Sequence, residues 1–277
     1  MDPRITICIV HYNKLDRLRN TVSALEENTD QPYILKILNN GYEDDEILSY
    51  LTDLENKDYT EIIYGEENLG CPPGRNWILR DIDTPYAMTL DDDMYVEEGW
   101  LEEVFDIFST DSDIGVIGIP YWEGNTLRGG ARVETDRNIV NVDQLDWDDI
   151  SDEQRTIQVE DVPGGTMVFR TALLEEFAWG SQFFVGMGDL DKSLQIMETD
   201  WKQVMATHIA FEHNVTTDED YAQVRKDYRE RHRSYRKFVS KWGYRLSLRE
   251  HIMFNYLFRL PWPVVNRIEK LYDRISE

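Results

Sequence analysis

The chain has 277 residues, of which 54 are acidic and 29 basic, so its formal net charge at pH 7 is −25. A phosphate backbone would be repelled by this charge, which argues against a nucleic-acid partner. With 41% hydrophobic residues, the chain is long enough to bury the core of one large domain, or of one domain with a smaller appendage.

The basic residues are mostly arginine, with 9 lysines against 20 arginines. Excess carboxylate and scarce lysine suit a protein kept soluble in concentrated salt, where its self-repulsion is screened. We therefore expect a halophilic protein; an ordinary acidic cytosolic protein is the alternative. Cys8 and Cys71 offer no disulfide framework, which favours a reducing, cytoplasmic location. We expect neither a signal peptide nor a transmembrane helix, because no apolar run reaches about 18 residues.

Strand-like and helical segments alternate in the first part of the chain. Apolar, β-branched or aromatic runs predict strands at 5–10, 33–38, 61–64 and 86–90. Helical spacing and helix-start signals predict helices at 15–27, 44–55, 74–80 and 99–108. This alternation predicts βαβ units, and therefore an α/β fold with a mostly parallel sheet and helices on both faces.

The pattern is less regular in the second part of the chain. Further strands are predicted at 114–120, within 162–170 and at 208–211. The segment 121–160 is polar, and a solvated acidic loop is expected within it at 143–153. From about residue 217 the composition becomes basic and aromatic, which predicts a helical appendage. We therefore divide the chain into a domain at 1–216 and an appendage at 217–277.

Four loops follow predicted strands, and the sharpest local feature lies in the last of them. In a parallel sheet the loops 11–13, 39–44, 68–76 and 91–93 should gather at one edge, where ligands bind. Asp91, Asp92 and Asp93 repel one another unless a cation or hydrogen-bond donors neutralise them. Hard cations such as Mg²⁺ and Mn²⁺ prefer these oxygen ligands. An exposed acidic turn is the alternative.

Seven short motifs occur in one order between about residues 4 and 216, and each of them is weak alone. They are Ile5–Asn13, Leu38–Gly41 with Asp44, Asn68–Gly70 with Arg75-Asn76, Leu90–Asp93 with Gly99–Leu101, Gly164–Arg170, Gly188–Asp191 and His208–Thr216. Together they resemble the family 2 glycosyltransferases of the GT-A fold.

The resemblance implies a donor site for a nucleotide sugar. Val10, His11 and Tyr12 match the segment that borders the base, and Asn39 stands where the family usually has an aspartate that reads it. Arg75 matches an arginine near the nucleotide, with a surface arginine as the alternative.

The resemblance also implies which residues of the aspartate triplet contact the ribose and which contact the metal. Asp91 and Asp93 match the Asp-x-Asp motif, one near the ribose and the other on a Mn²⁺ or Mg²⁺ ion that bridges the diphosphate. Asp92 is an alternative metal ligand. His213 would complete the metal site, with His208 as its rival.

The resemblance also implies the catalytic base and the stereochemistry. Asp189 matches the general base that deprotonates the acceptor hydroxyl, with Asp191 as the rival; the family more often has Glu-Asp where this chain has Gly188-Asp189. Gly164 and Gly165 match a loop that lets the backbone approach the donor sugar or the acceptor. Inversion at the anomeric carbon is implied. Aromatic residues that are candidates for stacking on a sugar ring are Tyr121, Trp122, Trp179 and Trp201.

The predicted function is therefore metal-assisted, inverting transfer of a sugar from a nucleoside diphosphate sugar, expected to be a UDP-sugar, to a hydroxyl of a glycan or lipid-linked acceptor. A non-catalytic protein that keeps the fold to bind carbohydrate or nucleotide is the alternative. A nucleotidyltransferase is disfavoured, because it would need a glycine-rich basic loop where this chain has His11-Tyr12-Asn13-Lys14.

The basic-aromatic segment 225–249 and the apolar segment 251–265 would suit peripheral contact with the inner face of a membrane. Packing of these segments on the acidic domain is the alternative.

Overall fold

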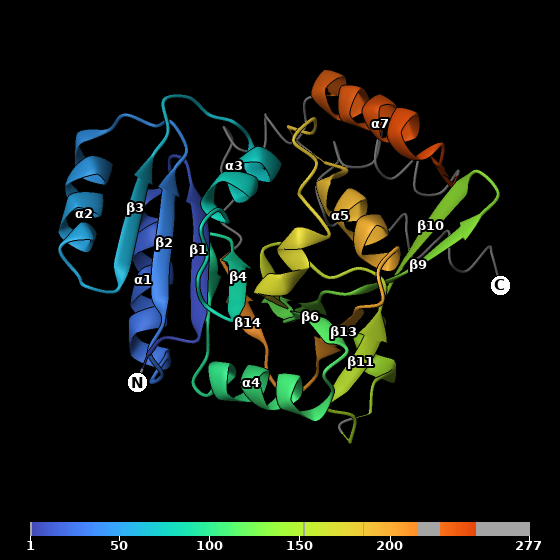
Figure 1. Cartoon of the computed structure of the whole chain (residues 1–277), viewed down its shortest axis with the longest axis horizontal. Helices are drawn as coiled ribbons and strands as arrows, with labels where there is room; N and C mark the ends of the chain where they lie inside the picture. The colour runs from blue at the N-terminus through green and yellow to red at the C-terminus, as the bar shows by residue number, and fades with distance from the viewer. Residues whose placement is uncertain (1, 152, 185, 215–227, 248–277) are drawn as a thin grey trace.

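The computed structural model describes residues 2–151, 153–184, 186–214 and 228–247. An eight-stranded sheet runs through its centre in the order β11-β13-β6-β12-β4-β1-β2-β3 (Figure 1). The strands are β1 (Ile5–His11), β2 (Ile34–Asn39), β3 (Thr60–Tyr64), β4 (Tyr86–Leu90), β6 (Ile114–Gly118), β11 (Thr156–Val159), β12 (Thr166–Arg170) and β13 (Lys202–Ala206). Six of them run in one direction, and β11 and β12 run in the other.

Helices cover both faces of this sheet, because alternate residues of its buried strands are apolar on both sides. Ile5, Ile7 and Ile9 of β1 point into one core, whereas Cys8 between them points into another. The first core contains residues of α1 (Leu15–Asn28), α2 (Asp45–Glu55) and α4 (Trp100–Thr110). The second contains residues of α3 (Cys71–Ile78), α5 (Gly188–Met197) and the 3₁₀ helix η2 (Thr171–Glu175). The α/β fold is thus confirmed.

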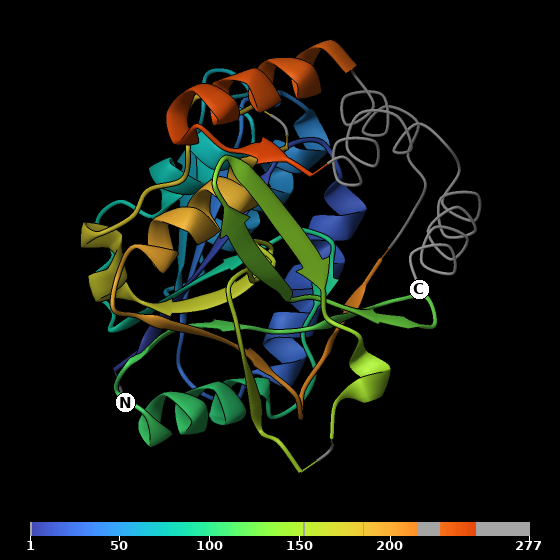
Figure 2. The same ribbon diagram turned by 90° about the vertical axis from the view of Figure 1, so that its right-hand side faces the viewer.

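Two small sheets flank the central one. The first contains β5 (Met94–Tyr95), β14 (Phe211–His213), β7 (Tyr121–Glu123) and β8 (Thr126–Arg128). The second contains β9 (Ala131–Asp136), β10 (Ile139–Gln144) and β15 (Arg245–Leu246). In Figure 1, α7 (Tyr228–Trp242) lies above α5 and the β9–β10 hairpin lies beside it. Figure 2 shows the same elements from the side of the hairpin. A third apolar core joins them.

The predicted elements of the first part are confirmed within a few residues. In the second part, the last predicted strand is displaced, and five short strands (β7 to β11) lie in the segment 121–160, where the sequence pattern predicted none. The strand predicted at 208–211 begins only at Phe211, as β14, and is preceded by β13, which ends at Ala206. The segment 121–160 is largely strand, and the acidic loop within it contains the end of β10 and a 3₁₀ helix, η1 (Trp147–Asp149). Short strands with charged outward residues, such as β9, gain their stability from pairing with a partner, which a local pattern does not show.

Helix α7 agrees with the predicted helical appendage, while its boundary near residue 217 and the segment 251–265 lie outside the described residues. Within the part of the chain that the structure describes, no helix is both long and apolar enough to cross a membrane.

Candidate active site

The loops predicted to gather at one edge of the sheet do so. The backbone carbonyl of His11, at the end of β1, accepts a hydrogen bond of 2.7 Å from the amide of Asn40, which follows β2. The side chain of Asn40 donates to Asn68 at 3.1 Å. The amide of Asp91, which follows β4, donates to the carbonyl of Gly165 at 2.9 Å. The strand ends thus bring together motifs that lie far apart in the sequence.

Arg75 connects the aspartate triplet to the predicted general base. Its Nη2 lies 2.7 Å from Oδ1 of Asp91, and its Nη1 lies 3.4 Å from Oδ1 of Asp189. The arginine side chain is only 7% exposed, whereas those of Asp91 and Asp189 are 37% and 56% exposed. A buried cation thus holds two carboxylates that remain open to solvent, and the alternative of a surface arginine is wrong.

Arg75, Asp91 and Asp189 form a charged triad, and burial and neighbouring charges shift the pKa values of Arg75 and Asp189. Burial alone would lower the pKa of Arg75, but the neighbouring Cys71, Asp91 and Asp189 raise it above its usual range, so the guanidinium stays charged. Desolvation by surrounding protein atoms raises the pKa of Asp189, and the positive charge of Arg75 opposes this rise. Because more than half of the Asp189 side chain is accessible, the desolvation is partial.

Trp179 supports Arg75 from the other side. The guanidinium carbon lies 4.5 Å from the centroid of the Trp179 ring, within the range of a cation–π contact. The next residue of α3, Asn76, binds the backbone of Trp179, donating to its carbonyl at 2.5 Å and accepting from its amide at 2.8 Å. Since Trp179 is 1% exposed, its predicted stacking on a sugar ring is wrong. Its role as a platform required the tertiary structure.

Gly164 and Gly165 lie directly against the triad. A β-carbon on Gly164 would lie 2.4 Å from both Nη1 of Arg75 and Oδ1 of Asp189, and one on Gly165 would lie 2.2 Å from Oδ2 of Asp91. The carbonyl of Gly164 is held by the hydroxyl of Thr89 at 2.6 Å. A side chain at either position would therefore have to displace the guanidinium or the carboxylates beside it.

The other two aspartates of the triplet have partners of their own. Oδ2 of Asp92 lies 2.5 Å from Nδ1 of His11, whose side chain is fully buried. Burial raises the pKa of Asp92, and the hydrogen bond with His11 opposes the rise. Oδ2 of Asp93 lies 3.2 Å from Nη1 of Arg17 and 3.5 Å from Nε2 of His213. Arg17 is a neighbour of the triplet that the sequence did not indicate, because it lies on α1 with an ordinary helical pattern around it.

Asp93 and His213 could supply part of a metal site. Among the described residues, no group of three or more histidine, cysteine, aspartate or glutamate side chains is placed to hold a metal ion alone. Asp93 and His213 nevertheless present one oxygen and one nitrogen to the same space, while His208 is exposed to solvent. Such a pair suits Mg²⁺ or Mn²⁺, which usually takes its remaining ligands from substrate phosphates and water. The residues therefore fit a metal that binds together with a diphosphate.

Some residues predicted to border the base are exposed to solvent, and others are hydrogen-bonded to the protein. The ring of Tyr12 is 39% exposed and packs edge-on against Tyr42, with centroids 5.2 Å apart. Asn39 is 3% exposed; its amide nitrogen donates to the carbonyl of Tyr42 at 2.9 Å and its oxygen accepts from the amide of Tyr42 at 3.2 Å. Asn39 thus stabilises the loop. Val10 is half-buried, and Tyr12 offers an accessible surface.

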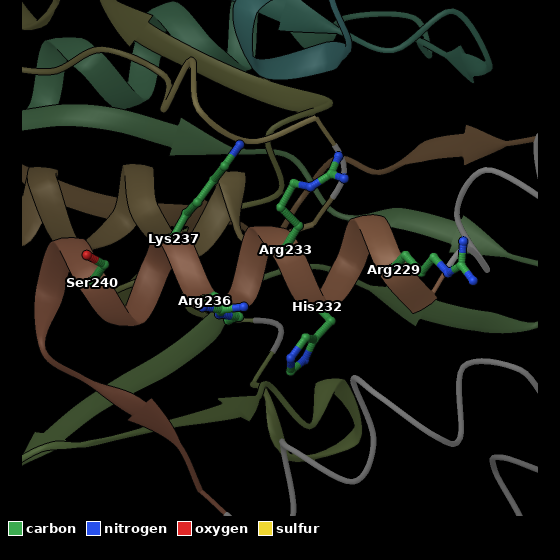
Figure 3. A pocket seen from close by; sticks show the side chains of 6 residues that line it. All are labelled: Arg229, His232, Arg233, Arg236, Lys237 and Ser240. Carbon is green, nitrogen blue, oxygen red and sulfur yellow. The ribbon is translucent and has the colours of Figure 1, made fainter.

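A hollow of about 480 Å³ lies elsewhere, on the outer side of α7. Figure 3 shows its lining, which among the described residues consists of Arg229, His232, Arg233, Arg236, Lys237 and Ser240. None of these residues belongs to a motif of the donor site, so we place the candidate active site at the strand ends, where the carboxylates converge.

The family assignment rests on comparison of the whole sequence with known families. Residues 6–177 match the family described as Glycosyl transferase family 2. The chain belongs to this family. No curated protein matches the chain at a significant level.

Solved structures of glycosyltransferases share the fold of this family 2 member. GalNAc-T7 with UDP, GalNAc and Mn²⁺ has 17% identity and a TM-score of 0.62, over 76% of this chain and 44% of that one. The mannosyltransferase PcManGT from Pyrobaculum calidifontis, in complex with GDP-Man and Mn²⁺, has 14% identity and a TM-score of 0.61, over 87% and 65%. TarS of S. aureus has 15% identity and a TM-score of 0.55, over 80% and 63%. These likenesses show the GT-A fold, and the chain spans 44% to 65% of the length of the three proteins.

Proposed function

We propose that this family 2 glycosyltransferase moves a hexose from a nucleoside diphosphate sugar, expected to be a UDP-sugar, to a hydroxyl of a glycan or lipid-linked acceptor, with inversion at the anomeric carbon. The observation that carries the proposal is the Arg75 bridge, which holds accessible carboxylates of Asp91 and Asp189 at one point beside Gly164 and Gly165. The choice of donor is motivated by the UDP and GDP-Man complexes of proteins with the same fold.

Asp189 is the general base in this proposal. Its carboxylate accepts the proton of the acceptor hydroxyl as that oxygen attacks the anomeric carbon from the face opposite the leaving group. Arg75 orients the carboxylate and stabilises its ionised form, while desolvation makes it more basic than an aspartate in water. Asp191 suits this role less, because its side chain is fully buried.

The diphosphate end of the donor lies at the aspartate triplet in this proposal. Asp93 and His213, together with Asp91 as the Asp-x-Asp motif implies, would hold a divalent metal. When bound, this metal supplies positive charge that stabilises the departing diphosphate. Tyr12 offers its exposed ring to the base. We infer that Arg75 acts on the donor through the two aspartates, since both of its terminal nitrogens already contact carboxylates.

Calorimetric titration tests the donor site. UDP, GDP and their sugars are titrated in high-potassium buffer with Mn²⁺ or Mg²⁺, and again with a chelator. Binding of one nucleotide should depend on metal and be lost in Asp93→Ala, but not in Asp200→Ala, whose exposed carboxylate follows α5. An unchanged affinity in Asp93→Ala would contradict the metal assignment.

Turnover tests the catalytic role. With the donor so identified, Asp189→Asn should retain donor binding and lose about 10²–10⁴-fold in kcat, and the product anomer measured by NMR should be opposite to that of the donor. Donor binding without turnover by the parent protein would instead support the non-catalytic alternative.

A further inference from the structure

Helix α5 presents two carboxylates to different surroundings. Asp189, in its first turn, contacts Arg75 at 3.4 Å and is 56% exposed. Asp191, two residues later, has a fully buried side chain. Successive residues of an α-helix are rotated by about 100°, so these two side chains leave α5 at about 200° to each other. One faces the candidate active site and the other faces the opposite side, toward α7.

The buried carboxylate of Asp191 is bound mainly from the last turn of α7. Its Oδ1 lies 2.6 Å from Nζ of Lys241 and accepts a hydrogen bond of 2.8 Å from Nε1 of Trp242. Its Oδ2 accepts from Gln195 of α5 at 2.9 Å. A buried carboxylate needs a cation and hydrogen-bond donors, and here a helix more than thirty residues further along the chain supplies both.

Apolar packing continues the same contact toward the start of α5. Phe238 of α7 is 0% exposed and lies in one cluster with Phe183 and Met187, which precede α5. Lys237 of α7 donates to the backbone carbonyl of Gln182 at 2.6 Å. Figures 1 and 2 both show α7 over α5. Helix α7 therefore touches both α5 and the loop that leads into it.

The backbone of that loop needs such support. Met187, the residue before α5, has a φ of +61°, which a side chain other than glycine adopts at a cost. Its side chain is 8% exposed within the cluster that contains Phe238. Asp189 follows two residues later, in the first turn of α5. The left-handed turn at Met187 therefore determines the position of the Asp189 side chain.

We propose that Asp191, Lys241 and Trp242 form a clamp through which α7 positions Asp189 for catalysis. Asp191 is a positioning residue in this arrangement: it faces away from Asp189 and acts through the orientation of α5. The proposal rests on the function proposed above, in which Asp189 is the general base.

The test uses the full chain and variants of the α7 side of the clamp, because removing Asp191 itself could prevent folding. Trp242→Phe keeps an aromatic ring, although a smaller one than the indole, and loses the N–H donor. Lys241→Met removes the cation. Arg236→Met is the matched control, since it removes an exposed cation on the outer side of the same helix (Figure 3). For each variant, kcat, KM for acceptor, calorimetric Kd for donor and Tm are measured.

The two clamp variants should lose about 10- to 100-fold in kcat, the range expected from a misplacement of about 1 Å, with a donor Kd within about twofold of the parent. Lys241→Arg should restore most of kcat, and Arg236→Met should match the parent. In an Asp189→Asn background, Trp242→Phe should cause no further loss, because both changes remove the same function.

A parental kcat in folded Trp242→Phe and Lys241→Met would overturn the clamp. An equal loss in Arg236→Met, or a loss of donor affinity as large as that of kcat, would overturn it as well. Failure of the underlying function has a different signature, namely a parental kcat in Asp189→Asn. If Asp189→Asn loses activity while the clamp variants keep theirs, only the present proposal fails.

Discussion

A methyl group at Gly164 should separate Arg75 from Asp189. The added β-carbon would lie 2.4 Å from Nη1 of Arg75, 2.4 Å from Oδ1 of Asp189 and 2.5 Å from the ring of Trp179. Ordinary contacts of this kind require about 3.5 Å or more, so these groups must move by roughly 1 Å. The Arg75–Asp189 contact, already 3.4 Å long, would then be lost.

The expected size of the effect follows from this displacement. Overpacking of a tight site costs about 1–3 kcal/mol of the free energy of unfolding, which for a protein of this size lowers Tm by roughly 2–10 °C. Misplacement of a catalytic group by about 1 Å lowers kcat by up to about 10²-fold. Gly164→Ala should therefore fold, melt slightly earlier and lose about 10- to 100-fold in kcat.

Gly99→Ala is the control for the loss of stability. Gly99 has a φ of +79° and no atom within 4 Å of an added β-carbon, so alanine there introduces backbone strain without a clash. This strain costs about 1–2 kcal/mol, close to the cost expected at Gly164. Differential scanning fluorimetry and initial rates should show both variants destabilised and only Gly164→Ala slow. A parental kcat in Gly164→Ala, or an equal loss in Gly99→Ala, would refute the role assigned to the Arg75 bridge.

Two further predictions concern stability. Because the pKa of Asp189 is raised in the folded state, its protonated carboxyl stabilises the fold at acid pH, and this contribution is lost as the pH rises through the folded-state pKa. Asp189→Asn should therefore have a higher Tm than the parent at pH 7, and the difference should narrow toward pH 4. A lower Tm of Asp189→Asn at pH 7 would contradict this sign. The net charge of −25 should make Tm rise between 0.1 M and 1 M KCl, because salt screens the repulsion among the excess carboxylates and the screening length falls from about 10 Å to about 3 Å. A Tm that does not depend on salt would favour an ordinary acidic protein over a halophilic one.

Much of the fold was predictable from local pattern. The β-branched run of β1 and the helical spacing of α1 depend on residues close in the sequence, and both elements begin where predicted. The same alternation predicted that the loop after β1 and the loop after β2 would meet, as the hydrogen bond from Asn40 to His11 shows. The short strands between 121 and 160 were missed, because each depends on a partner strand rather than on its own composition.

The composition, the order of the motifs and the candidate aspartates were determined by the sequence alone, and they were sufficient to indicate the family. What only the tertiary structure decided is how neighbouring candidates differ. Asp189 and Asp191 are separated by one residue, yet one contacts Arg75 and the other contacts Lys241 of α7. Asn39 occupies a binding motif, yet its amide is engaged by the backbone of Tyr42. The physical reason is that the direction of a side chain on a helix, and the charge it meets there, depend on elements that are distant in the chain and adjacent only after folding.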